Sequence, residues 1–221
     1  MYQHRNQHGD LIALPVGKVV CVGRNYLDHI RELNNDVPDE PLLFMKPAGA
    51  LCDVSEPLHI PVGQGPCHNE LEVAVLIGKR LTKADTTAAA EGIHSVGLAL
   101  DLTLRDVQSQ LKAKGQPWER AKAFDRACPV SGFVAREEID QLNDLAFSLI
   151  VNTALRQQGN TNMMMRDTLS LLCAISEVFT LEPGDIVLTG TPKGVGPLEA
   201  GDTLTLNMPP WLNIQTRVGY K

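Results

Sequence analysis

Two acidic residues, Glu70 and Glu72, have the types and the spacing to bind a metal ion. They lie in the run 68–78, whose apolar and β-branched residues predict a strand. Because successive side chains of a strand alternate between faces, these two carboxylates point the same way. Like charges this close repel each other unless a cation or a proton separates them. An antiparallel strand with one solvated face would also explain the pair.

A third carboxylate, Asp101, lies in the alternating run 97–105, where leucines occupy the opposite face of the predicted strand. The small residues Gly97 and Ala99 leave space beside it. Carboxylate oxygens suit Mg²⁺, Mn²⁺ or Ca²⁺ better than zinc, and three protein ligands leave coordination positions open for a substrate. The three residues therefore predict either an open site for a divalent ion or two strands with solvent-facing acids.

Short strands predominate among the elements that must position these side chains. Besides the two acidic runs, apolar segments bounded by Gly, Pro or Asn predict strands at 11–14, 18–22, 41–47, 145–151, 186–188 and 203–207, with a turn at 157–160. The segment 189–196 is a Gly-rich loop whose backbone amides could approach an anion closely. It lacks the spacing of a nucleotide-binding P-loop.

Helices are expected to be few and short. Capping residues and helical periodicity predict them at 28–33, 85–92, 106–114 and 167–179, the last with a stripe of Leu169, Leu172, Cys173 and Ser176. His29 and Glu32 share one side of the first helix, because residues three apart are neighbours on a helix surface. Such a pair is most often only a surface contact.

Composition excludes several classes of protein. The 221 residues suit one domain, and a net charge of −6 without a basic stripe argues against nucleic acid as a partner. No apolar run is long enough to span a bilayer, so no membrane partner is expected. Five scattered cysteines without a C-x-x-C pair argue against a disulfide framework and a zinc knuckle, and they fit a reducing cytoplasm.

The chain resembles the fumarylacetoacetate hydrolase family, and most closely its small acylpyruvase-like members. The motifs that support the resemblance occur in order from Val19 onward: Val22-Gly23-Arg24-Asn25-Tyr26 with His29 and Glu32, Phe44-Met45-Lys46-Pro47, Glu70-Leu71-Glu72, Asp101 to Gln108, Pro117-Trp118 with Lys122, and Gly184-Asp185 followed by Thr189 to Gly196. The order of several separate motifs is specific for the family and much less specific for a substrate.

The resemblance implies a fold and an organisation. The fold is an α+β, β-rich, mixed β-sandwich roll of the fumarylacetoacetate hydrolase C-terminal-domain type, and the protein is expected to be a homodimer. Residues 1–221 would be a single catalytic domain, with an N-terminal extension at about 1–17 and a mobile lid at about 24–39.

The resemblance also assigns roles to residues. Glu70, Glu72 and Asp101 would bind Mg²⁺ or Mn²⁺, or Ca²⁺ in a crystal. The catalytic residues would be His29, Glu32 and Lys122, and the substrate-binding residues Arg24, Arg105, Gln108 and Thr191.

The implied reaction is metal-dependent hydrolysis of a C–C bond in an acylpyruvate-type 2,4-dioxo acid, a small 2-oxo acid, to give pyruvate and a carboxylate. The same site could instead decarboxylate oxaloacetate, or act as a tautomerase or isomerase of a 2-oxo acid such as oxaloacetate or 2-hydroxyhepta-2,4-dienedioate. A metal-dependent binding protein without catalysis would be expected to lack either Lys122 or the pair His29 and Glu32, and all three residues are present.

Overall fold

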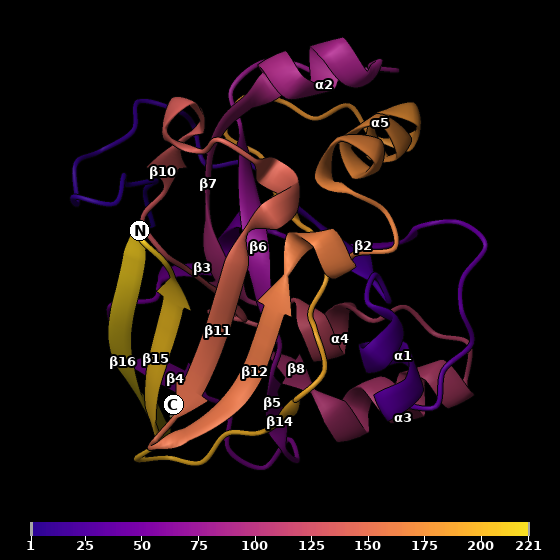
Figure 1. The fold of residues 1–221 in the computed structure, drawn as a ribbon. Helices are drawn as coiled ribbons and strands as arrows, with labels where there is room; N and C mark the ends of the chain where they lie inside the picture. The colour runs from indigo at the N-terminus through magenta and orange to yellow at the C-terminus, as the bar shows by residue number, and fades with distance from the viewer. Residues whose placement is uncertain (1, 221) are drawn as a thin grey trace.

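The largest sheet is built mostly from the apolar segments that the sequence predicts as strands. In this computed structural model, which describes residues 2–220, its strand order is β2 (Leu42–Lys46), β1 (Val19–Gly23), β13 (Ile186–Leu188), β6 (Leu71–Ile77), β7 (Ile93–Leu100), β9 (Cys128–Val130) and β3 (Leu51–Asp53), and β10 (Val134–Ala135) pairs with β7. The pairs β1–β13 and β3–β9 are parallel, and the other neighbours are antiparallel. Figure 1 shows β6 and β7 running through the middle of the molecule.

Two smaller sheets complete the β-structure. One has the order β12 (Ala154–Asn160), β11 (Ala146–Val151), β15 (Thr203–Met208), β16 (Leu212–Tyr220) and β4 (Leu58–Ile60); the other has the order β14 (Gly196–Pro197), β5 (Cys67–Asn69) and β8 (Thr103–Leu104). Val73 and Leu98 of the largest sheet share one buried apolar cluster with Leu149 and Leu204 of the second. The two sheets therefore enclose the main core, which confirms the predicted β-rich α+β fold.

The other face of the largest sheet is buried as well. Ala74, Leu76 and Ala99 belong to a second apolar cluster together with Val19 and Ile186. Every residue of β6 is buried, Glu72 included. The interpretation of the acidic residues as members of a solvated face is therefore wrong.

The helices lie at two ends of the molecule. They are α1 (Leu27–Glu32), α2 (Thr86–Gly92), α3 (Arg105–Ala113), α4 (Glu119–Lys122) and α5 (Thr168–Val178), with short 3-10 helices at Ala48–Ala50, Arg136–Glu138, Leu142–Asp144 and Thr161–Met163. Asp85 and Asp167 cap α2 and α5 by accepting hydrogen bonds from backbone N–H groups. Figure 1 shows α2 and α5 at one end, and α1, α3 and α4 at the other. Among the described residues, no helix is long and apolar enough to cross a membrane.

The predicted stripe of α5 is only partly correct. Leu172 and Ser176 are buried, but Leu171 and Ile175 are buried with them, whereas Leu169 and Cys173 are only partly covered. The buried face of α5 is therefore rotated from the predicted one. The helix packs against α2 as well as the main core, as the placement of both helices in Figure 1 indicates.

Both acidic strands are shorter than predicted, because each breaks at an acidic residue. The register of β6 and β7 ends at the pair Leu71 and Leu100. Beyond this pair, the backbone N–H of Asp101 donates to the carbonyl of Glu70 at 2.8 Å. On the far side of the breaks, β5, which precedes β6 in the chain, pairs with β8, which follows β7. The two breaks therefore lie side by side at one end of the sheet.

The strands differ from the sequence prediction in three other places. Residues 11–14 form no strand: Leu11 makes only an isolated bridge to Arg5, and the segment lies on the second apolar cluster through Ile12 and Leu14. Residues 157–160 are part of β12 and not a turn. The longest strand, β16, was not predicted, because exposed side chains interrupt its apolar pattern.

Candidate active site

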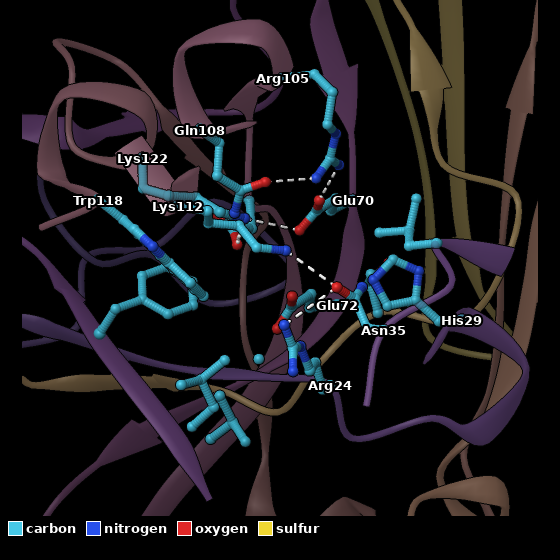
Figure 2. A pocket seen from close by; sticks show the side chains of 17 residues that line it. Arg24, His29, Asn35, Glu70, Glu72, Arg105, Gln108, Lys112, Trp118 and Lys122 are labelled. Carbon is cyan, nitrogen blue, oxygen red and sulfur yellow. Dashed lines mark hydrogen bonds and ion pairs between the residues drawn. The ribbon is translucent and has the colours of Figure 1, made fainter. Parts of the chain in front are cut away.

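Glu70, Glu72 and Asp101 converge in the structure as the sequence predicts. One carboxylate oxygen from each lies within 4.8 Å of the others, and all three residues are buried. Glu72 belongs to β6, while Glu70 and Asp101 occupy the two breaks beside it. Figure 2 shows Glu70 and Glu72 in the pocket that these residues line.

Three cations, Lys122, Arg105 and Lys46, contact Glu70 or Asp101. The Lys122 ammonium donates to Glu70 Oε2 at 2.8 Å and to Asp101 Oδ2 at 2.5 Å, and Arg105 pairs with the other oxygen of Glu70. Burial alone would raise the pKa of Glu70, but Lys122 and Arg105 outweigh it and hold that pKa well below its usual value. Burial alone would lower the pKa of Lys122, but the Asp101 and Glu70 carboxylates raise it, so Lys122 stays protonated.

Glu72 lacks such a partner and is the carboxylate most in need of a cation. Its Oε2 accepts from the backbone N–H of Gly190 at 2.6 Å, and among the described residues Glu72 forms no ion pair. Burial, followed by the charges of Asp101 and Glu70, raises its pKa well above the usual value. In addition, Asp101 Oδ1 is buried without a hydrogen bond, since Lys46 lies 2.7 Å away but outside hydrogen-bond geometry. An oxygen-rich set with unmet negative charge fits a hard divalent cation.

His29 lines this pocket and faces Glu32, which does not line it. His29 Nδ1 lies 3.5 Å from Glu32 Oε2, and His29 is 6% exposed. Burial lowers the pKa of His29, although Glu70 and Glu32 act in the opposite direction. Glu32 also accepts from the backbone N–H of Gly194 at 2.9 Å. The Gly-rich loop 189–196 thus directs its amides at Glu72 and Glu32, two anions of the chain itself.

The predicted substrate-binding residues all line the same pocket. Arg24 follows β1 directly and has a left-handed backbone (φ 58°), which is uncommon for a non-glycine residue and recurs at functional sites. Arg105 donates to Gln108 Oε1 at 2.6 Å. The Thr191 hydroxyl donates to the Leu71 carbonyl at 2.8 Å and accepts from Gln157 at 2.8 Å, so it holds the wall of the pocket together.

Four residues that contact the site were not predicted from the sequence: Lys46, Lys112, Asn35 and Gln157. Lys46 is fully buried, and its ammonium contacts the carbonyl of Lys122, the Ala127 carbonyl at 3.0 Å and the Asp101 carboxylate. It therefore fixes both a metal-ligand candidate and the helix of Lys122. Lys46 lies in one of the motifs that support the family resemblance, which was a signal in the sequence. Only the tertiary contacts of its ammonium group reveal its role.

Gln157 ties the break at Glu70 to the Gly-rich loop. Its Oε1 accepts from Asn69 at 2.8 Å and from the backbone N–H of Leu71 at 2.9 Å, and its amide donates to Thr191 and to the Pro192 carbonyl. Because all these groups are buried, replacing the amide by an apolar group would leave several of them without partners.

Gln157→Leu is expected to lower the free energy of unfolding by about 2–4 kcal/mol, the cost of a few unsatisfied buried polar groups. Urea unfolding followed by circular dichroism measures this change. Gln158→Leu is the matched control, because Gln158 is the next residue of β12 and is exposed, and it should change stability by no more than about 0.5 kcal/mol. Equal losses in both variants would refute the bridging role of Gln157.

Comparisons with known proteins agree with this geometry. The sequence profile described as Fumarylacetoacetate (FAA) hydrolase C-terminal matches residues 18–219. The oxaloacetate tautomerase YcgM of Escherichia coli (strain K12) is 53% identical over 207 residues, which are 93% of this chain and 94% of YcgM. The mitochondrial oxaloacetate decarboxylase of Dictyostelium discoideum is 42% identical over 188 residues, 85% of this chain and 86% of that protein.

A solved structure shares the fold at lower identity. The crystal structure of fumarylpyruvate hydrolase from Pseudomonas aeruginosa in complex with Mn²⁺ and pyruvate has a TM-score of 0.92 and 32% identity, and the match covers 100% of this chain and 96% of that one. Together with the profile match across most of the chain, these likenesses confirm the resemblance found in the motifs. The chain belongs to the fumarylacetoacetate hydrolase family.

Proposed function

We propose that this chain is a divalent-metal-dependent tautomerase that interconverts the enol and keto forms of oxaloacetate. The observation that supports this best is that one pocket holds a buried imidazole, His29, together with three carboxylates and the Lys122 ammonium. The names of the relatives favour oxaloacetate as the substrate. They support this alternative better than the main prediction from the sequence, hydrolysis of an acylpyruvate.

Enolisation requires a base for the C3 proton and positive charge beside the oxygen on C2. The C–H bond at C3 breaks, its electron pair forms the C2–C3 double bond, and the oxygen on C2 gains the charge and then a proton. Ketonisation is the reverse and returns a proton to C3. Neither direction needs an oxidant or a reductant.

His29 supplies the base. Because burial lowers its pKa, the imidazole is neutral at neutral pH and can accept a proton. With the Nδ1 proton facing Glu32, Nε2 is free to take the proton from C3 and to return it. Glu32, held by the N–H of Gly194, keeps the ring in that tautomer.

Lys122 supplies positive charge. Its raised pKa keeps it protonated, so it is unsuited to act as a base and instead stabilises the oxyanion that develops on C2. Arg105 and Gln108 orient the substrate from α3. A divalent ion on Glu70, Glu72 and Asp101 would supply Lewis-acid charge beside the same oxygen, and Mg²⁺ and Mn²⁺ both suit these ligands.

C–C bond cleavage is a second candidate, favoured by the likeness to fumarylpyruvate hydrolase. In decarboxylation the C3–C4 bond breaks in place of C3–H, carbon dioxide leaves, and the electron pair forms the C2–C3 double bond of the pyruvate enolate. In hydrolysis His29 would activate a water molecule against the distal carbonyl. All three reactions use the same charges around C2, so the fate of C3 distinguishes them.

A panel of substrates tests the proposal. Oxaloacetate in its enol form and acetylpyruvate are each supplied with Mg²⁺, and enol absorbance and pyruvate release are recorded. We expect rapid loss of the enol form of oxaloacetate. Neither oxaloacetate nor acetylpyruvate should release much pyruvate. Rapid pyruvate release from acetylpyruvate, with enol loss at the rate of the blank, would instead establish a hydrolase.

The proposed lid makes a separate prediction. Tyr26 and Ile30 are buried, whereas much of 31–39 is exposed, so opening should be largest in 31–39. With Mg²⁺ and oxalate, an enolate mimic, the amides of 31–39 should exchange more slowly, as hydrogen-exchange mass spectrometry would detect. The segment 79–85, exposed except at Leu81 and Ala84, is the control and should not change. Equal exchange in 31–39 with and without oxalate would contradict a lid.

A single catalytic domain over 1–221, a homodimer and a cytoplasmic location stay predictions from the sequence. Analytical ultracentrifugation tests the dimer: one species of twice the chain mass is expected, and a monomer at all concentrations would contradict it.

A further inference from the structure

Two cations at the rim of the pocket converge on a neutral oxygen. Arg24 Nη2 donates to Asn35 Oδ1 at 3.1 Å, and Lys112 Nζ donates to the same oxygen at 3.0 Å. Figure 2 shows these contacts, with Asn35 entering from the loop after α1. All three residues line the pocket that contains Glu70 and Glu72.

The local charge at this position is unbalanced. Among the described residues, neither Arg24 nor Lys112 forms an ion pair, whereas Arg105 pairs with Glu70. Partial burial, followed by the charges of Arg24 and Arg105, lowers the pKa of Lys112. An amide oxygen satisfies the geometry of the two donors without cancelling their charge, so the position favours an anion.

Helix α3 connects this position to the metal-ligand candidates. Arg105, Gln108 and Lys112 are spaced by three and four residues, so they lie on one face of the helix. Arg105 contacts Glu70 at one end of the row, and Lys112 contacts Asn35 at the other. A substrate held near Glu70 would therefore extend its far end toward Lys112 and Arg24.

We propose that Arg24 and Lys112 form the subsite for the distal carboxylate of a 2-oxo diacid, and that the Asn35 amide holds this subsite until the carboxylate displaces it. The inference rests on the proposed function, since it supplies the subsite that the C4 carboxylate of oxaloacetate needs. Asn35 has the shape of a carboxylate side chain but no charge, so an anion can replace it at the two cations.

Binding of two matched ligands tests the subsite without any turnover. Malate and lactate are both 2-hydroxy acids, and malate carries one additional, distal carboxylate. Calorimetry with the Mn²⁺-loaded protein should show tighter binding of malate than of lactate. Lys112→Met should weaken malate binding by about ten-fold, the effect of losing one charged hydrogen bond, and leave lactate unchanged. Lys114→Met is the control, because Lys114 is exposed nearby and does not line the pocket.

Asn35→Asp tests the role of Asn35. A permanent carboxylate between Arg24 and Lys112 should compete with malate and weaken it about ten-fold, again without an effect on lactate. If Asn35 served only to hold the loop in place, the affinities of both ligands would change together, and that outcome would overturn the proposal. Equal binding of malate and lactate by the unaltered protein would overturn it too.

The proposed function can fail independently of this inference. Failure of the unaltered protein to accelerate oxaloacetate tautomerisation, with a preference for malate that depends on Lys112, would refute the tautomerase and keep the subsite. Tautomerisation of oxaloacetate without a preference for malate over lactate would support the tautomerase and refute the subsite.

Discussion

Glu72→Gln is expected to weaken the binding of Mg²⁺ or Mn²⁺ by more than about a hundred-fold, because even outer-shell changes around a metal cost about 10–100-fold in affinity. The protein should remain folded. Glu72 pairs with no lysine or arginine among the described residues, and the glutamine oxygen can still accept from Gly190. Isothermal calorimetry of metal binding measures the effect.

Two comparisons sharpen this prediction. Asp101→Asn should also lose metal binding, but it leaves Lys46 and Lys122 short of a carboxylate, and breaking such buried pairs typically costs about 3–5 kcal/mol of stability. In the folded, metal-free protein the raised pKa of Glu72 makes this carboxyl group bind a proton more tightly than it does in the unfolded chain. The free energy of unfolding therefore falls as the pH rises above the usual pKa of glutamate. Metal-free Glu72→Gln should therefore be at least as stable as the unaltered protein at pH 7. Unchanged metal affinity would remove Glu72 from the ligand set.

His29→Asn is expected to lower kcat/KM for oxaloacetate tautomerisation by about two to four orders of magnitude, the usual contribution of a general base. Metal affinity and melting temperature should change little, since His29 is not among the carboxylates that would bind the metal and the variant loses only the long, 3.5 Å contact between Nδ1 and Glu32. Stopped-flow measurement of enol loss, alongside calorimetry of Mg²⁺ binding, separates the two effects.

Glu32→Gln is the graded control for the dyad. The amide oxygen can still accept from Gly194, so only the negative charge facing His29 is lost, and a smaller loss of activity is expected than in His29→Asn. Metal-dependent decarboxylation of oxaloacetate needs no base at C3, so His29→Asn should retain more of it than of tautomerisation. Equal losses of both activities would show that His29 acts through lid closure and not through the C3 proton.

Alternation along two strands predicted the shared face of Glu70 and Glu72 and offered Asp101 as a third carboxylate, and the resemblance then assigned all three to one metal ion. The breaks at Glu70 and Asp101 were not predictable from either run, because each run alternates without interruption. They depend on a cross-strand hydrogen bond between Asp101 and Glu70 and on the cations that face these carboxylates. Local periodicity contains neither kind of information.

Residues that act through tertiary contacts were missed for the same reason. Gln157 reads as a polar turn residue, yet it is buried and joins four groups. Lys112 reads as an exposed helix residue, and its relation to Arg24 and Asn35 appears only when α3 packs against the loop after α1. The Gly-rich loop was predicted to approach an anion, but that its anions are Glu72 and Glu32 required the fold.

We expect this pocket to transfer a proton at C3 of oxaloacetate, and exchange of the C3 hydrogens with D₂O tests this step most directly. Proton NMR of keto-oxaloacetate in D₂O follows both the C3 signal and the methyl signal of pyruvate. The Mg²⁺-loaded protein should accelerate loss of the C3 signal far beyond the rate with Mg²⁺ alone, without a matching increase in pyruvate. Exchange at the rate of Mg²⁺ alone while pyruvate accumulates would contradict it.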